Sequence, residues 1–222
     1  MKFFLLPILF FANIVLAQEL PNESFLFGKE YFPFNDKIEL IYETTNGESK
    51  RITEIANDLY KLTFSGNNFK YSQTFTDKNN GVYLVKTEQT VKILFVFSKH
   101  AEIVYPFPAL QIKQPTKVGD TWSWKGYQIK NEDDTVAIAV TGKALAEEEI
   151  EVPAGKFKTL KVQIIVKSST GTKTTFTQWL AKNLGGIKMN IKTEGHGLFQ
   201  FAMDILGYDE INSELKEIKY LE

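Results

Sequence analysis

The chain has 222 residues, of which 43% are hydrophobic and 14% aromatic, and it contains no cysteine. Its 26 basic and 27 acidic side chains nearly balance, so it lacks the basic excess that a nucleic-acid-binding protein shows. The absence of cysteine excludes disulfides, thiol catalysis and an acylated cysteine anchor, while the length and apolar content suffice for one hydrophobic core.

The first seventeen residues have the pattern of a secretory signal peptide. Lys2 precedes an apolar run, and Val15 and Ala17 provide the small side chains that signal peptidase requires at positions −3 and −1. The run is shorter than the roughly 20 apolar residues that span a bilayer, and Pro7 weakens it further as an anchor. We expect cleavage between Ala17 and Gln18 and a soluble periplasmic or extracellular protein that does not span a membrane.

The mature chain has the pattern of short strands separated by turns. Residues such as Leu62 and Phe64 alternate with polar neighbours, which is typical of a half-buried strand. Asn-Gly and Gly-Gly pairs recur between these runs and accept the positive φ of tight hairpins. We predict an all-β single domain over residues 18–222, built as a curved antiparallel sheet or half-barrel of roughly 11 to 14 strands with at most one short helix.

Three segments need a choice between interpretations. Residues 91–97 are apolar at successive positions, which predicts a central strand buried on both faces. Residues 51–60 fit either one helix or two strands joined by a turn at Asn57-Asp58. Residues 213–222 fit a helix or a closing strand, and the β-rich context favours the strand.

Proline and glycine mark two further features. Residues 105–115 contain three prolines, which interrupt a strand ladder because proline has no N–H, and they predict a crossover within one sheet. In Val152-Pro153-Ala154-Gly155-Lys156-Phe157 a four-residue loop, residues 153–156, would place Val152 opposite Phe157. We also expect a β-bulge near residues 158–159, because Leu160 and the alternate residues after it share a face that Phe157 does not.

Tryptophans are the only candidate ligand-binding residues. Trp122 and Trp124 are two residues apart and therefore lie on one face of the strand that follows Gly119-Asp120. Together with Trp179 they could form the wall of an apolar cavity, or they could be ordinary core packing, which is the commoner role.

Catalytic and metal-binding patterns are missing from the sequence. His100 and His196 have no acid or histidine at ligand spacing, and the acidic residues 147–151 point alternately to opposite faces of a strand, as expected of a solvated edge. Residues 131–134 lack the spacing of a calcium loop. We therefore expect no catalytic residues, no metal, no cofactor and no enzymatic activity.

Several motifs together resemble an exported bacterial group of unknown function. These motifs are Gly119-Asp120-Thr121-Trp122, Val152-Pro153-Ala154-Gly155-Lys156-Phe157, and Gln178-Trp179-Leu180-Ala181 followed by Gly185-Gly186-Ile187-Lys188. The resemblance covers roughly residues 107–189, and Trp179-Leu180 departs from the group's commoner Trp-Tyr. It implies a curved antiparallel sheet distantly similar to the LolA/LolB lipoprotein carriers, whose half-barrels hold acyl chains, and it implies no catalytic residues.

Three functions stay open. The sheet could bind a lipid or another apolar small molecule, it could pair with another envelope protein, or it could be a carboxylate-dependent hydrolase. The hydrolase would need two acids in one cleft. Export, aromatic strands and the missing catalytic patterns favour the first.

Overall fold

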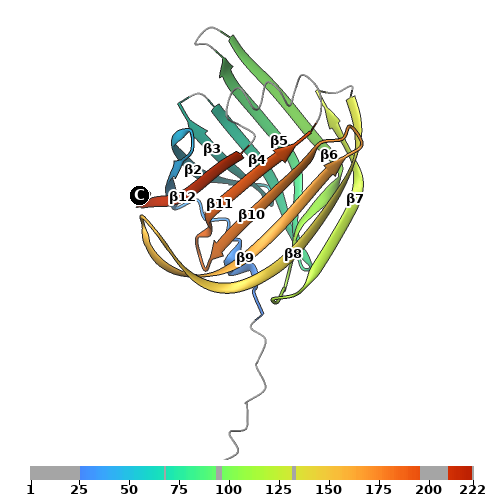
Figure 1. Ribbon diagram of the computed structural model, residues 1–222. Coiled ribbons are helices and arrows are strands. Elements are labelled where there is room, and N and C mark those ends of the chain that lie inside the picture. Colours follow the sequence, from blue (N-terminus) through green and yellow to red (C-terminus); the bar gives the residue numbers. More distant parts are fainter. Residues whose placement is uncertain (1–25, 68, 94–96, 132–133, 196–209, 222) are drawn as a thin grey trace, which may run out of the picture.

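Twelve antiparallel strands close into one barrel (Figure 1). The computed structural model describes residues 26–67, 69–93, 97–131, 134–195 and 210–221. The strands are β1 (Ile38–Thr44), β2 (Gly47–Ala56), β3 (Leu59–Gly66), β4 (Phe69–Lys78), β5 (Gly81–Ile93), β6 (Phe97–Lys113), β7 (Thr121–Lys130), β8 (Asp134–Val152), β9 (Gly155–Ser168), β10 (Lys173–Ala181), β11 (Gly185–Glu194) and β12 (Glu210–Tyr220). Each strand pairs with its neighbours in chain order, and β1 pairs with β12 to close the ring.

The predicted all-β class and strand number are confirmed. Helical structure in the described ranges consists of one 3-10 turn, η1 (Lys29–Tyr31). No helix in these ranges has the length and hydropathy needed to cross a membrane. The expected signal peptide and its cleavage site lie outside the described residues.

Alternation along each strand decides which side chains fill the barrel. On β9, Leu160, Val162 and Ile164 are buried, while Lys161 and Gln163 between them are not. The buried residues of neighbouring strands meet in register, as Val162 does with Ala144. The core is therefore a layer of inward-facing side chains around the inside of the ring.

An aromatic segment before β1 fills one end of this barrel. We call Phe27, Tyr31, Phe32 and Phe34 the aromatic plug. Phe32 and Phe34 lie with their ring centroids 5.5 and 6.0 Å from that of Phe75, and Phe34 stacks on Tyr60 at 4.0 Å. In Figure 1 the blue segment that precedes β1 lies at the lower end of the barrel.

Polar contacts fasten the plug to the turns at the same end. The backbone of Phe27 exchanges two hydrogen bonds with Thr116, between β6 and β7, at 2.7 and 3.0 Å. The Asn183 N–H, in the turn between β10 and β11, donates to the Glu30 carbonyl at 2.6 Å. Since these turns belong to different sides of the ring, the plug ties the end of the barrel together.

The long hairpin of β8 and β9 covers this end as well. It curls beneath the barrel (Figure 1) until the Ala154 N–H donates to the Leu215 carbonyl of β12 at 3.0 Å. Val152 and Phe157 at its tip consequently pack with Leu40 and Leu215.

The predicted positions of the loop and of the bulge in this hairpin were wrong. Val152 pairs with Gly155, so the loop has two residues, Pro153 and Ala154. Gly155, which follows this loop, has a positive φ of 129°. The bulge lies instead on β8, between Ala144 and Ala146. β9 needs no bulge near Phe157, because the hairpin curls so that Phe157 reaches the core from the opposite face of the strand to Leu160.

The two ambiguous segments are strands. β2 ends at Ala56 and β3 begins at Leu59, and Asn57 and Asp58 between them have φ values of 50° and 60°, as a tight hairpin with two left-handed residues requires. Most of the C-terminal segment belongs to β12, whose pairing with β1 closes the barrel.

The central strand expected at residues 91–97 was wrong. Ile93 at the end of β5 pairs with Phe97 at the start of β6, so the two ends of the segment belong to different strands, and residues 94–96 lie outside the described residues. The error arose because the apolar run contains no glycine, proline or asparagine to mark a strand end.

The prolines of residues 105–115 lie along and just after β6. Between the pairs Leu84–Ala109 and Lys86–Val104, four residues of β6 stand opposite Val85 alone. β6 also pairs with β7 only at Ile103–Lys130 and Val104–Ile129. The prolines therefore interrupt the ladders on both sides of β6 while the strand keeps its place in the ring.

Two glycines make room for the tryptophans of β7. Gly142 on β8 pairs with Trp122, and a Cβ atom at Gly142 would overlap the indole ring. A Cβ at Gly126 would overlap the ring of Trp124 in the same way. A glycine inside a strand often marks such a close approach.

The substitution Gly142→Val should destabilise the barrel by about 1–3 kcal/mol, because Trp122 has to leave its site. Urea unfolding followed by circular dichroism measures this change. Ala139→Val is the matched control, since Ala139 lies on the outward face of the same strand and its substitution should change stability by less than about 0.5 kcal/mol. Equal losses in the two variants would contradict the packing described.

Candidate functional site

Inward-facing side chains described in the half of the barrel away from the plug are only partly buried. Near the plug, the inward-facing residues Leu40, Leu180 and Ile187 are at most 1% exposed. Further along the same strands, Phe176 of β10 and Met189 of β11 also face inward, but they are only partly buried. Inward-facing side chains in the described part of this half are therefore less completely buried than those near the plug, and we call the inside of this half the lumen.

Uncharged polar side chains line much of the lumen. Neutral hydrogen-bonding residues at inward positions of the described strands include Thr44, Gln73, Thr87, Gln89, Gln128, Thr174, Gln178 and Ser213. Among inward positions of this half whose side chains the structure describes, the charged residues are Lys130 and Asp134, which pair at the start of the β7–β8 turn. The lumen thus combines an apolar floor with hydroxyl and amide groups above it.

Buried tyrosines lie among these polar groups. Burial raises the pKa of Tyr71, and it raises the pKa of Tyr105 to about 12, although a hydrogen bond from Thr87 opposes the shift of both. Both phenols stay protonated at neutral pH and can donate or accept hydrogen bonds.

Two other buried polar side chains form hydrogen bonds to backbone carbonyl groups. The Tyr42 hydroxyl donates to the Gly186 carbonyl at 2.7 Å, and the Arg51 guanidinium donates to the Leu184 carbonyl at 2.7 Å. These bonds fasten β1 and β2 to the turn that begins β11, so we assign both residues a structural role.

The structure brings Trp122 and Trp124 together and places Trp179 elsewhere. Trp122 is 7% exposed, and its indole N–H donates to the Gln111 carbonyl at 2.8 Å, so it belongs to the core. Trp124 is partly buried and packs against two core clusters, which places it in the inner wall.

Trp179 lies on the outer surface, because its neighbour Leu180 faces inward. Its ring lies between two ammonium groups, with Lys161 Nζ 4.7 Å and Lys188 Nζ 5.5 Å from the centroid. Its indole N–H donates to the carboxylate of Glu148. Trp179 therefore does not contribute to the lumen.

The sequence patterns did not identify the residues that line the lumen. The sequence patterns assigned no binding role to Thr174 and Phe176, which face inward. The sequence signal that could have identified these residues is the presence of polar side chains on both faces of β10. A strand whose inner face packs on a filled core has apolar residues on that face.

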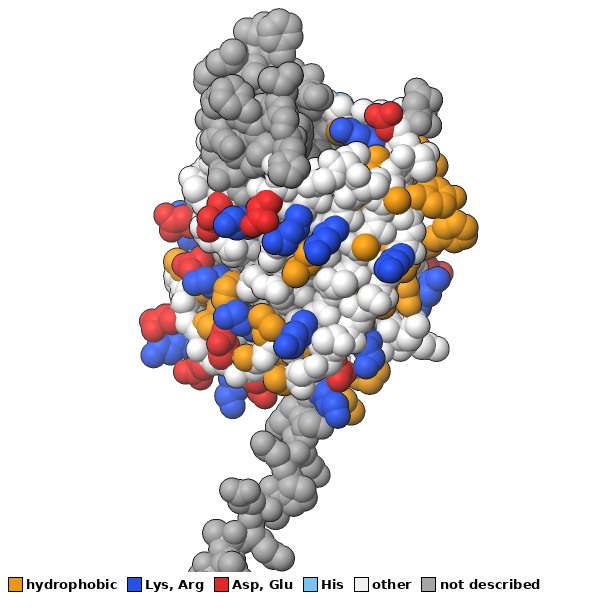
Figure 2. Space-filling model, turned by 45° about the vertical axis from the view of Figure 1, so that its right-hand side comes forward, with side chains coloured by type: hydrophobic (Ala, Val, Ile, Leu, Met, Phe, Trp, Pro, Cys, Tyr) orange, Lys and Arg blue, Asp and Glu red, His pale blue; other side chains and the backbone are white. Residues whose placement is uncertain are grey.

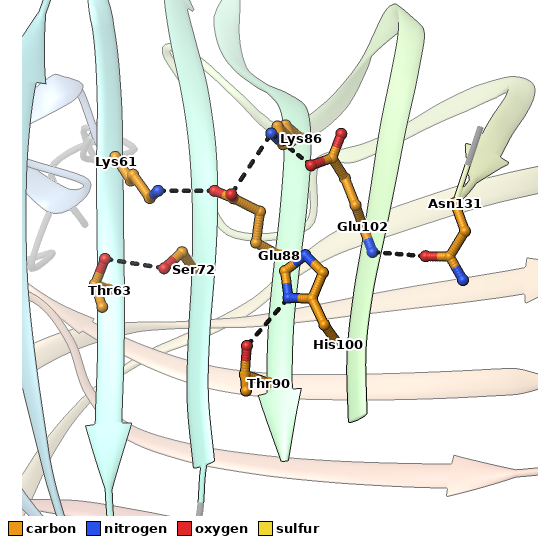
Figure 3. Close-up of polar contacts among 9 residues, drawn as sticks. All are labelled: Lys61, Thr63, Ser72, Lys86, Glu88, Thr90, His100, Glu102 and Asn131. Carbon is orange, nitrogen blue, oxygen red and sulfur yellow. Dashed lines mark hydrogen bonds and ion pairs between the residues drawn. The ribbon is translucent and has the colours of Figure 1, made fainter. Parts of the chain in front are cut away.

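Charged side chains of β3 to β6 form a ladder on the outside of the barrel (Figure 3). Glu88 lies between Lys61 and Lys86, at 2.7 and 3.5 Å, and Lys86 also contacts Glu102 at 2.8 Å. The two lysines lower the pKa of Glu88. Because all four groups are partly exposed, each pair contributes little to stability.

Asn131 extends this ladder across the weak junction of β6 and β7. Its side-chain oxygen accepts the Glu102 N–H at 3.0 Å, and its own N–H donates to the Glu102 carbonyl at 2.9 Å. His100, farther along β6, contacts the Thr90 hydroxyl at 3.1 Å. His196 lies outside the described residues.

The described residues contain no group of three or more acidic or histidine side chains that could hold a metal ion. Glu148 is engaged by Trp179 and Lys161, and Glu151 lies 3.6 Å from Lys156. A pocket of about 310 Å³ lies at β1, β11 and β12. Its lining includes the inward-facing Thr44, Met189 and Ser213 and the outward ion pair of Lys188 and Glu214, at 2.6 Å.

These features define an antiparallel barrel that is packed with apolar side chains at one end and has partly buried, largely uncharged polar residues facing inward at the other. The family model described as DUF3108-like matches residues 35–194, and the chain belongs to this family. No curated protein matches the chain.

Solved structures with low sequence identity are similar to the chain. A candidate lipoprotein from Parabacteroides distasonis has 12% identity and a TM-score of 0.39, covering 85% of this chain and 98% of its own. The hypothetical lipoprotein YmcC from Escherichia coli has 10% identity and a TM-score of 0.43, covering 86% and 90%. A candidate exported protein with a YmcC-like fold from Bacteroides fragilis has 14% identity and a TM-score of 0.41, covering 88% and 99%.

Alkaline pH should destabilise the barrel through its buried tyrosines. The folded-state pKa of Tyr105, about 12, lies above its unfolded value of 10. The protonated phenol therefore contributes fully to the free energy of unfolding below pH 10, and this contribution is lost as the pH rises towards 12. Between pH 8 and pH 11 the wild type should lose about 1 kcal/mol more stability than Tyr105→Phe, which has no phenol to ionise. Urea unfolding at the two pH values measures the difference, and identical losses would contradict the burial of this hydroxyl.

Proposed function

We propose that this protein is exported and that its lumen binds an amphipathic molecule with an apolar chain. The observation that carries the proposal is the partial burial of inward-facing side chains such as Phe176 and Met189, in a barrel whose other end is fully packed. Partly exposed apolar side chains inside a concave wall gain free energy when an apolar chain covers them.

The width of the barrel supports this use. A barrel of about eight strands is just wide enough to be filled by its own side chains or to hold one small ligand. Twelve strands enclose more space, and the plug fills only one end of it. The remaining space opens above an apolar floor, which suits an elongated ligand.

The lining favours a ligand whose polar part is uncharged. Gln73, Gln178 and Thr87 offer amide and hydroxyl groups, whereas a buried charge on the ligand would require an opposite charge in the wall. Hydroxyl or amide groups on the ligand satisfy these side chains without such a partner. Acylglycerols and similar neutral lipids have this chemistry.

The sequence supports the other parts of the proposal. The signal-peptide pattern of the first seventeen residues indicates export with cleavage after Ala17. The resemblance to the LolA/LolB carriers points to acyl chains as the cargo. We place no catalytic step in the lumen, because the described residues bring no pair of carboxylates together there.

A brominated monoacylglycerol tests the proposal, because bromine quenches tryptophan fluorescence only at short range. With protein that begins at Gln18, we expect saturable quenching that persists in Trp179→Phe and is strongly reduced in Trp124→Phe. Quenching that depends on Trp179 alone would place the ligand on the outer surface and contradict the proposal.

A matched pair of variants on β10 locates the ligand. Gln178 faces inward and Thr177 outward, so Gln178→Phe should occupy the lumen while Thr177→Phe should not. We expect about a tenfold or greater loss of affinity for the first variant and no change for the second. Thermal unfolding checks that both variants fold, and equal affinities in the two would argue against binding in the lumen.

A further inference from the structure

The outer surface of four adjacent strands carries lysines without acidic neighbours. Outward positions of β7 to β10 include Lys125, Lys143 and Lys167, and Lys125 and Lys167 flank Ala139 in one cross-strand row. In the described parts of β7, of β8 from Thr135 to Lys143, of β9 from Lys161 and of β10, no outward residue is Asp or Glu. We call this surface the lysine face.

No carboxylate in the part of the chain that the structure describes neutralises the three central lysines of this face. No described carboxylate forms an ion pair with Lys125, Lys143 or Lys167. Lysines at its margins do have partners, since Lys161 contacts Glu148 and Lys173 contacts Glu194. Because the whole chain carries a formal net charge of −1, the positive charge is segregated to this side.

The space-filling view shows the same arrangement. Figure 2 shows Lys and Arg side chains spread over the middle of the molecule, with most of the acidic side chains towards the left. The outward residues between the lysines carry no charge and include Ser123, Thr141 and Ala139, with Ile165 beside Thr141.

Two exposed aromatic residues border the lysine face. Phe107 of β6 is 61% exposed and Tyr127 of β7 is 36% exposed, and their rings meet edge to face at 5.8 Å. Tyr127 is two residues from Lys125 and therefore shares its outward direction. An exposed phenylalanine is unfavourable in water unless a partner covers it.

We propose that the lysine face and this aromatic pair dock the protein onto a bilayer with anionic phospholipid headgroups. Lysine ammonium groups bind headgroup phosphates, and aromatic rings settle at the level of the headgroups. A dissolved polyanion would use the lysines but would leave Phe107 exposed, which is why we favour a membrane surface. The docking is peripheral and inserts no strand into the bilayer.

Sedimentation with lipid vesicles tests this inference on protein that begins at Gln18. We expect binding to vesicles containing about 30% phosphatidylglycerol, little binding to pure phosphatidylcholine vesicles, and weaker binding at high salt. The triple variant Lys125→Gln, Lys143→Gln, Lys167→Gln should bind about 100-fold more weakly, since each lysine near an anionic surface accounts for about a fivefold change.

A second triple variant provides the control. Lys37, Lys70 and Lys182 are exposed lysines outside the lysine face, and changing all three to glutamine alters the net charge equally. This variant should keep most of the affinity for vesicles. Phe107→Ser should weaken binding to vesicles several-fold with little change in the thermal midpoint, because the side chain is largely exposed.

Three outcomes would overturn the inference. They are equal losses in the two triple variants, equal binding to neutral and anionic vesicles, and binding to dextran sulfate as tight as that to vesicles with no effect of Phe107→Ser. The last result would assign the face to a soluble polyanion. Because the lysine substitutions leave the lumen intact, quenching by the brominated ligand separates this inference from the proposed function.

Discussion

The width of a twelve-stranded ring is the constraint on which the rest of this structure depends. Closing twelve strands gives each strand a neighbour on both sides, although β6 and β7 pair at two positions only. Such a ring is wider than the eight-stranded barrels whose own side chains just fill them. The chain fills one end with four aromatic residues and covers it with the curled β8–β9 hairpin. The other end keeps the space that we assign to a ligand.

In the barrel wall, two tryptophan rings lie over glycines, which have no side chain. Trp122 and Trp124 lie over Gly142 and Gly126, so the widest side chains occupy positions where the strand presents only backbone. The same region contains the junction of β6 and β7, where the ladder has two residue pairs. Side-chain bonds replace the missing ladder there, from Asn131 to Glu102 and from the Trp122 indole to Gln111.

One set of strands serves both proposed roles because alternate residues face opposite sides. On β10, Phe176 and Gln178 face the lumen, while Thr175 and Thr177 belong to the outer surface. On β7, Trp124 faces inward and Lys125 outward. A protein that docks on a bilayer through the outside of β7 to β10 would hold its lumen beside the membrane. Such an arrangement suits the transfer of a lipid.

Local signals predicted much of this fold. Alternation predicted the all-β class and a range of strand numbers that includes twelve, and a turn at Asn57-Asp58 was one of the two alternatives for residues 51–60. The errors came where contacts distant in sequence decide the outcome. Residues 91–97 carry no turn residue, and the β8–β9 hairpin takes its register from curling onto β12.

The sequence by itself determined which residues alternate, where most turns lie and the pattern of an exported chain, because these depend on neighbours within a few positions. Only the tertiary structure decided that the sheet closes, that Trp179 lies outside while Trp122 and Trp124 lie inside, and that the plug fills one end. Closure requires β1 to meet β12 across most of the chain, and local periodicity carries no information about such a contact.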